Sequence, residues 1–252
     1  MSVRDYGSKG RVGVAPPQAN PTVEPEITAC LPPGVSMLVT RLTSQCAEPK
    51  DRMLAYVDNF DQALQCYDTL KPDVVAFACT ASSYMIGHER EDREFAAHAK
   101  KRGYPIITGA KAIIAALKHL GIKHIAIGAP YPTWTLDACK IYYEQAGFKI
   151  TSILQIETAS STDTRSIYEL TSADAIAALP RMDVKGAECV LFTGSGMPSL
   201  RALIAAEEQT GLPALSTNLC LGWALCSALG LQQWATGPHR LLNGWQDRLK
   251  LL

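Results

Sequence analysis

The stretch KPDVVAFACTASSYMIG, residues 71–87, decides the fold. Its apolar run Val74–Ala78 ends at Cys79 and Thr80, and small hydroxyl residues follow. This order predicts a buried parallel strand, a tight loop and the start of a helix. Free backbone N–H groups and the positive end of the helix dipole favour an anion at such a junction. We therefore predict a lowered pKa and a reactive thiolate for Cys79; the plainer alternative is a core cysteine at a strand end.

Outward from this stretch, strands and helices alternate along the first half of the chain. The Pro-rich segment PPQANPTVEPE after the first strand continues neither a sheet ladder nor a helix until about Val23. Alternation at this pitch predicts a parallel α/β sheet. The expected strands are residues 11–15, 35–41, 74–78 and 104–108, and the expected helices are 53–70, 89–102 and 110–119.

The same order of elements begins again at Lys123, so the chain contains an internal repeat. We expect two similar α/β halves, residues 1–121 and 122–230, and a tail, 231–252, that packs as a helix over one half. Ligands of open parallel sheets bind beyond the carboxyl ends of the strands, so the strand-end loops of both halves should surround one cleft. The matching segments are RVGVAPPQANP (11–21) with HIAIGAPYPTW (124–134), KPDVVAFACTA (71–81) with GAECVLFTGSG (186–196), and 103–121 with 211–230.

The composition excludes several classes of function. Lysine plus arginine equals aspartate plus glutamate at 24 each, so we expect neither nucleic acid nor membrane as a partner. The N-terminal stretch lacks the apolar core of a signal peptide, and no apolar run reaches the roughly 18 residues of a membrane span. These features predict a cytoplasmic protein whose eight cysteines are reduced thiols. The five histidines form no close pair and the cysteine spacings fit no zinc pattern, so we expect no metal.

Aligning the sequences of the two halves pairs two loops with each other. Cys79 falls opposite Gly194, and Thr80 falls opposite Ser195. One half thus offers a nucleophile or an acid, and the other a Gly-Ser-Gly turn whose backbone N–H groups can form an anion-binding nest. Facing loops of this kind suit a dicarboxylate or an enediolate, although a plain strand-to-helix turn explains the glycines equally well.

These segments resemble a known family, the cofactor-independent aspartate/glutamate racemase superfamily, and within it the branch of maleate cis–trans isomerases and arylmalonate decarboxylases. The resemblance implies two flavodoxin-like α/β halves related by a pseudo-twofold axis, an active site in the cleft between them, and no cofactor. It also implies cysteines, one from each half, on opposite faces of the substrate carbon. It covers nearly the whole chain and is carried by PPQANPTVEPE (16–26), DVVAFACTASSYMIG (73–87), IAIGAPY (125–131) and VLFTGSGMPSL (190–200).

Residue by residue, the resemblance implies that Cys79 is catalytic, since it matches the first-half cysteine that adds to the substrate double bond in maleate isomerases. Tyr131, also expected to be catalytic, matches the tyrosine that hydrogen-bonds the carboxylate or the enediolate, and it aligns in the repeat with Gln18. Asp163 lies about where isomerases carry a carboxylate-binding asparagine, and an acid there would repel a carboxylate. The predicted substrate-binding residues are Gln18, Asn20, Thr80, Ala81, Gly194, Ser195 and Gly196.

The chain departs from the family at Gly194, which matches the second-half cysteine. Two-base racemisation needs a proton donor on each face of the carbon, and one thiol cannot supply both. Cys220 and Cys226 are better explained as packing thiols, because one follows a different strand and the other lies further along its helix. Racemisation is therefore disfavoured.

The function that remains is a cofactor-free enzyme that acts on a small carboxylate or dicarboxylate through a cysteine thiolate, in the manner of a maleate cis–trans isomerase. One alternative is an arylmalonate-type decarboxylase, a carboxy-lyase that protonates an enediolate after loss of CO₂, and another is a different activity of the superfamily. A carboxylate-binding protein without catalysis is the alternative from another class. The sequence leaves open whether the chain forms a homo-oligomer.

Overall fold

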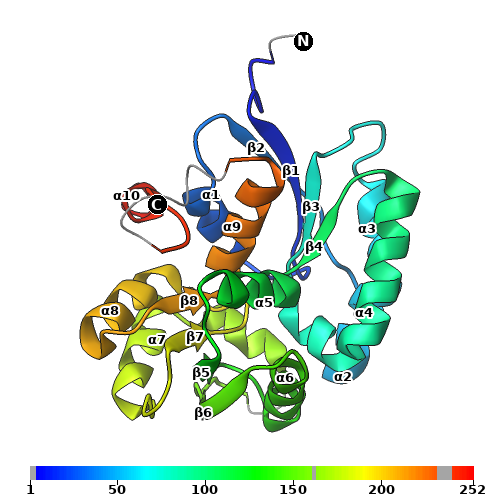
Figure 1. Cartoon of the computed structure of the whole chain (residues 1–252). Helices are drawn as coiled ribbons and strands as arrows, with labels where there is room; N and C mark the ends of the chain where they lie inside the picture. The colour runs from blue at the N-terminus through cyan, green and yellow to red at the C-terminus, as the bar shows by residue number, and fades with distance from the viewer. Residues whose placement is uncertain (1–3, 161–162, 232–239) are drawn as a thin grey trace.

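Two parallel four-stranded sheets, one from each half of the chain, form the core of the protein (Figure 1). The computed structural model describes residues 4–160, 163–231 and 240–252. The strands are β1 Gly10–Ala15, β2 Val35–Val39, β3 Val74–Phe77, β4 Ile106–Thr108, β5 His124–Ala129, β6 Lys149–Gln155, β7 Cys189–Phe192 and β8 Ala214–Ser216. The strand orders are β2-β1-β3-β4 and β6-β5-β7-β8, so the second sheet repeats the first. Both follow the first four positions of the flavodoxin-like order, which confirms the predicted α/β fold of two similar halves.

Helices pack against these sheets, and the central strands are buried. All four residues of β3 and all four of β7 are buried, which is why both segments are unbroken apolar runs in the sequence. The helices are α1 Val23–Cys30, α2 Pro49–Asp58, α3 Phe60–Gln65, α4 Thr80–Arg102, α5 Gly109–His119, α6 Thr133–Gln145, α7 Ser172–Ala178, α8 Leu200–Thr210, α9 Thr217–Ala228 and α10 Trp245–Leu249, with 3₁₀ helices η1 at Thr164–Glu169 and η2 at Leu179–Arg181. In Figure 1, α3 and α4 lie on one side of the first sheet, and α1 and α9 lie on the other.

Two predicted helices differ from those in the structure. The apolar spacing over 53–70 predicted one helix, but the chain forms α2 and α3 with a break at Asn59. The helix predicted at 89–102 begins at Thr80, immediately after Cys79, and is interrupted at Gly87, whose φ of 69° is not helical. A glycine with positive φ breaks the hydrogen-bond ladder and kinks the helix, so the two parts form one long bent helix.

Elements from the second half of the sequence also pack on the first half. Helix α9 contacts β3 and β4 of the first sheet as well as α1 and α5. In the tail, α10 packs on α1, and Arg248 donates from Nε to the carbonyl of Ala29 at 2.6 Å. Residues 232–239 of the tail lie outside the described residues, and the division of the chain into two halves and a tail stays a prediction.

Within the described ranges, no helix has the length and apolar character needed to cross a membrane. All eight cysteines fall in these ranges, and each is a free thiol. The same ranges contain no group of three histidine, cysteine, aspartate or glutamate side chains arranged to hold a metal ion.

A buried carboxylate joins the two halves. Glu26 of α1 is only 6% exposed, and it accepts hydrogen bonds from the first backbone N–H groups of α8, those of Ser199 at 2.6 Å and Leu200 at 2.8 Å. Its other oxygen accepts from the side-chain amide of Asn218 in α9 at 2.8 Å. An anion at a helix N-terminus satisfies N–H groups that have no partner within the helix. Burial raises the pKa of Glu26, and these donors oppose that rise.

We predict that Glu26→Gln destabilises the protein by about 1–3 kcal/mol, because a neutral amide turns a donor toward N–H groups that need an acceptor. Urea denaturation followed by circular dichroism measures the change. The control is Glu89→Gln, whose side chain is 97% exposed and should change stability by less than about 0.5 kcal/mol. Equal stability of the Glu26 variant and the parent would show that this carboxylate does not join the halves.

Candidate active site

The loops that follow β1, β3, β5 and β7 meet at one small cavity, as expected for facing parallel sheets. Its volume is about 30 Å³, enough for about one water molecule. A ligand with several carbon atoms therefore requires its walls to move. Eight of the nine predicted site residues line this cavity: Asn20, Cys79, Thr80, Ala81, Tyr131, Gly194, Ser195 and Gly196.

The ninth predicted residue, Gln18, does not lie at the cavity. Its side chain is exposed, and its Oε1 accepts a hydrogen bond from the backbone N–H of Ser44 at 2.8 Å. The repeat aligned Gln18 with Tyr131, but the two loops differ in conformation, so the matched position points elsewhere. The structure does not support substrate binding by Gln18.

Cys79 sits at the N-cap of α4, where the sequence placed it, and is 4% exposed. Its Sγ lies 3.9 Å from the sulfur of Met53 and 3.2 Å from the hydroxyl of Ser82, which is also within donating distance of the Met53 carbonyl at 2.7 Å. Burial raises the pKa of the Cys79 thiol, and hydrogen bonds from Ser82 and from the backbone N–H of Ala81 oppose the rise without cancelling it. The predicted lowering of this pKa is therefore wrong for the ligand-free protein. The donors at the helix start are present, but loss of solvent outweighs them.

Tyr131 and Thr80 connect the two halves across the cavity. The hydroxyl of Tyr131, from the loop after β5, lies 2.6 Å from Oγ1 of Thr80, the first residue of α4. Burial raises the pKa of Tyr131, so its hydroxyl keeps its proton at neutral pH. This side chain is a neutral hydrogen-bond donor at the cavity wall.

Asn20 and Ser195 form a second contact between the halves. The oxygen of the Asn20 side chain accepts from the backbone N–H groups of Thr22 and Val23, at 2.9 and 3.2 Å, and so fixes the start of α1. Its amide nitrogen donates to Oγ of Ser195 at 3.3 Å, and that hydroxyl donates to the carbonyl of Ala78 at 2.7 Å. Because its oxygen is already bound to two backbone N–H groups, Asn20 presents its NH₂ group to the cavity, and this donor suits an anionic ligand.

The position opposite Cys79 is closed to a second thiol. Gly194 has a φ of 119°, a conformation that residues with a side chain rarely adopt. A Cβ there would lie 3.2 Å from Cδ of Pro130. Cys220 and Cys226 are buried and do not line the cavity, as expected for packing thiols. Among the described residues, Cys79 is the one thiol at this site.

Sequence reasoning missed several residues that line the cavity. Thr164, Ile167 and Tyr168 of η1 line it, together with Met53 of α2. They carry no motif, and their spacing in the chain gives no sign that a 3₁₀ segment of one half covers a helix start of the other. The sequence held one clue to this segment: Asp163, an acid about where isomerases carry a carboxylate-binding asparagine, directly precedes η1.

Asp163 is held by two arginines instead of facing the cavity unpaired. Its carboxylate accepts from Nη2 of Arg52 at 2.7 Å and from Nε of Arg165 at 2.8 Å. Partial burial alone would raise the pKa of Asp163, but the bonds from Arg165 and Arg52 lower it to about 2. The expected repulsion of a carboxylate is thus reduced by a net positive cluster.

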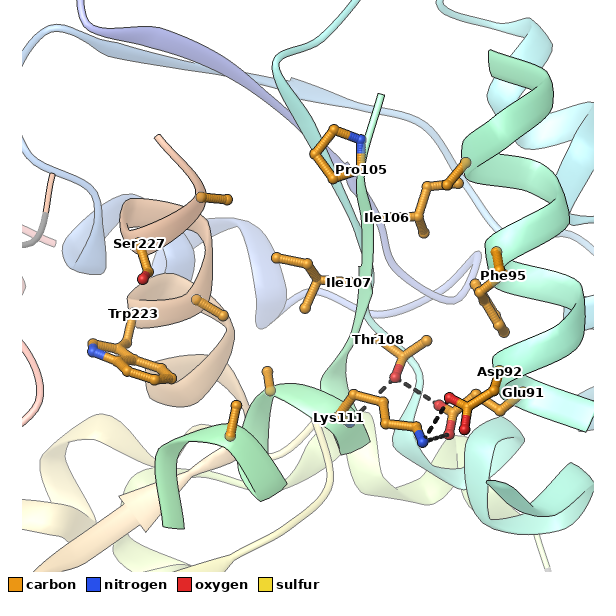
Figure 2. Close-up of a pocket in the computed structure, with 16 residues that line it drawn as sticks. Glu91, Asp92, Phe95, Pro105, Ile106, Ile107, Thr108, Lys111, Trp223 and Ser227 are labelled. Atoms are coloured by element: carbon orange, nitrogen blue, oxygen red, sulfur yellow. Dashed lines mark hydrogen bonds and ion pairs between the residues drawn. The ribbon is translucent and has the colours of Figure 1, made fainter. Parts of the chain in front are cut away.

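A much larger cavity, of about 630 Å³, lies elsewhere, between α4, β4, α5 and α9 (Figure 2). Its charged side chains are already paired: Lys111 contacts Asp92 at 2.7 Å, and Glu91 accepts from Thr108 at 2.6 Å and from Tyr142. Its lining contains no cysteine. We place the candidate active site at the smaller cavity because the cysteine and the neutral hydrogen-bond donors are there.

These observations define a two-lobed α/β protein with one cysteine in the cavity between its halves. The chain belongs to the arylmalonate decarboxylase family, whose sequence model matches residues 12–242. It is also similar to maleate isomerases. The one from Geobacillus stearothermophilus is 25% identical over 247 residues, covering 93% of this chain and 97% of the relative. The one from Pseudomonas putida is 27% identical over 246 residues, covering 93% and 97%.

Solved structures agree with the fold. The maleate isomerase of Pseudomonas putida S16 superposes with a TM-score of 0.82 at 22% identity, over 94% of this chain and 96% of that one. An arylmalonate decarboxylase superposes with a TM-score of 0.69 at 19% identity, over 93% and 96%. The fold predicted from the repeat and from the family resemblance is confirmed.

We predict that Ser82→Ala slows alkylation of Cys79 by iodoacetamide severalfold near pH 8, because it removes a donor that lowers the pKa of the thiol. Peptide mapping by mass spectrometry gives the rate, with exposed Cys46 as the reference within each molecule. Ser83→Ala is the matched control, since the hydroxyl of Ser83 is buried without a partner among the described residues. An unchanged Cys79 rate in the Ser82 variant would refute the contact.

Proposed function

We propose that the chain is a cofactor-independent isomerase of a small unsaturated dicarboxylate of the maleate type, with Cys79 as the nucleophile. The observation that carries this proposal is the position of Cys79 at the start of α4, in a cavity built by both halves and lined by neutral donors. The maleate isomerases that match over nearly the whole chain support it. A related maleate cis–trans isomerase from Nocardia farcinica is known with a covalently bound succinylcysteine intermediate.

The mechanism needs one thiol and no net proton transfer. The thiolate of Cys79 adds to one carbon of the double bond, and the π electrons move into the far carboxylate to form an enediolate. The former double bond is then a single bond and rotates. The enediolate electrons re-form the double bond and expel the thiolate, which leaves the trans isomer and the original enzyme.

The donors at the cavity stabilise the charge that develops. The neutral hydroxyl of Tyr131 and the amide NH₂ of Asn20 suit the carboxylate that becomes the enediolate. Thr80 and the Ser195–Gly196 turn offer further donors to the carboxylates. Because burial raises the pKa of Cys79, the thiol must first lose its proton to solvent, and the hydrogen bonds to its sulfur from Ser82 and from the N–H of Ala81 favour that ionisation.

The second candidate is decarboxylation of an arylmalonate-type substrate, which the family match favours. Here the enediolate left after loss of CO₂ would receive a proton from the thiol of Cys79. Gly194 leaves the opposite face without a thiol, so the product would be a single enantiomer. The remaining hypotheses are another activity of the superfamily and a carboxylate-binding protein without catalysis. Three further features stay predictions: a cytoplasmic location, a homo-oligomer, and division of the chain at residues 121 and 230.

Incubation with maleate and, separately, with phenylmalonate tests the proposal. We expect maleate to be converted to fumarate, followed by proton NMR, and Cys79→Ser to abolish turnover because a hydroxyl is a far weaker nucleophile and leaving group. Cys220→Ser is the control and should retain activity if folded. Release of CO₂ from phenylmalonate without fumarate formation would replace the isomerase proposal by the decarboxylase, and neither reaction would contradict both.

A further inference from the structure

The cavity has a buried cation beside it that the proposed mechanism does not use. Arg52 of α2 is 2% exposed. Its Nη1 donates to the carbonyl of Ala47 at 3.2 Å, and its Nη2 donates to Asp163 at 2.7 Å and to Oγ1 of Thr164 at 3.3 Å. Its Nε is buried and has no hydrogen-bond partner among the described residues. A buried guanidinium N–H without an acceptor is costly, and such groups in native proteins call for an explanation.

The position of Arg52 relates it to the reacting groups. The next residue, Met53, lines the cavity and lies against the sulfur of Cys79, and Thr164, which Arg52 contacts, lines the cavity as well. The charge of Arg52 also acts on the Cys79 thiol. The predicted binding groups around the cavity are neutral, so Arg52 supplies the positive charge that a second carboxylate would require.

We propose that Arg52 is the recognition site for one carboxylate of the substrate, and that Asp163 occupies this site in the ligand-free protein. This deepens the proposed function, on which it rests, by restricting the substrate to dicarboxylates. The carboxylate of the substrate takes the place of the Asp163 carboxylate on Arg52. The planar guanidinium group can bind it in a bidentate manner through Nε and one Nη. The acceptor that Nε lacks is then supplied by the ligand.

The surroundings of Arg52 permit this exchange. Asp163 keeps its bonds to Arg165, whose side chain is 58% exposed, so its charge stays compensated after release. Tyr56 on α2 and Tyr168 on η1 also face this group, and burial raises the pKa of both, so they remain neutral near pH 7. Asp163 directly precedes η1, which forms part of the cavity wall. Its release from α2 therefore frees the wall that a ligand larger than water has to displace.

Isothermal titration calorimetry with succinate and butyrate at pH 7 tests the proposal. Both probes have four carbons and no double bond, and they differ by one carboxylate, so binding is measured without turnover. We expect the parent to bind succinate at least tenfold more tightly than butyrate. Arg52→Met should abolish that preference while leaving butyrate binding unchanged, and Asp163→Asn should strengthen succinate binding severalfold because it removes the competing carboxylate.

Two further variants make the test specific. Arg90→Met breaks an ion pair between α4 and Asp58 of α2 away from the cavity and should leave the preference intact. Arg52→Lys keeps the charge but loses the fork, and we expect an intermediate preference; it also serves if Arg52→Met does not fold. Circular dichroism checks folding.

The result that overturns the inference is an unchanged succinate preference in folded Arg52→Met or Arg52→Lys. Equal binding of the two probes by the parent would overturn it too. The proposed function fails separately, if the parent prefers succinate through Arg52 but does not convert maleate. If maleate is converted with the same KM by the parent and the Arg52 variants, the function holds and the role of Arg52 is refuted.

Discussion

The facing of the two halves depends on a buried carboxylate. Glu26 accepts the free N–H groups at the start of α8 and a side-chain amide of α9, so a helix of the first half serves as the N-terminal cap for a helix of the second. Thr22, four residues earlier, donates to the carbonyl of Gly196 at 2.8 Å. These bonds bring the loop that carries Asn20 against the turn at residues 194–196. The cavity is therefore a consequence of how α1 and α8 meet.

Burial gives the site its chemical character. A helix start lowers the pKa of a thiol, but Cys79 is so far from solvent that burial outweighs this effect and raises its pKa. The same burial keeps Tyr131 neutral and so preserves it as a donor. The nucleophile and the donors thus share a buried cavity, and the ion pair of Arg52 and Asp163 lies beside it. A buried site has a low local dielectric constant, which strengthens each hydrogen bond to an anion inside.

The sequence was sufficient for the fold because strands and helices follow local patterns, and the family resemblance pointed to residues that the structure brings to one cavity. The apolar strand before Cys79 and its repeat before Gly194 predict parallel strands whose ends converge, and the structure brings those ends together. Other features depend on contacts between distant segments. No local pattern marks Glu26 as a cap for another half, or Arg52 as a neighbour of the cavity. The pKa of Cys79 was predicted in the wrong direction because burial, unlike a helix start, cannot be read from neighbouring residues.

The central claim is that Cys79 alone forms a covalent bond with an unsaturated dicarboxylate. Mass spectrometry of protein quenched in acid during incubation with maleate tests it most directly, because acid protonates the enediolate and traps the adduct as a succinyl thioether. We predict one added maleate per chain, located by peptide mapping at Cys79 and absent from Cys79→Ser. Turnover of maleate without any adduct at Cys79, or an adduct confined to another cysteine, would contradict it.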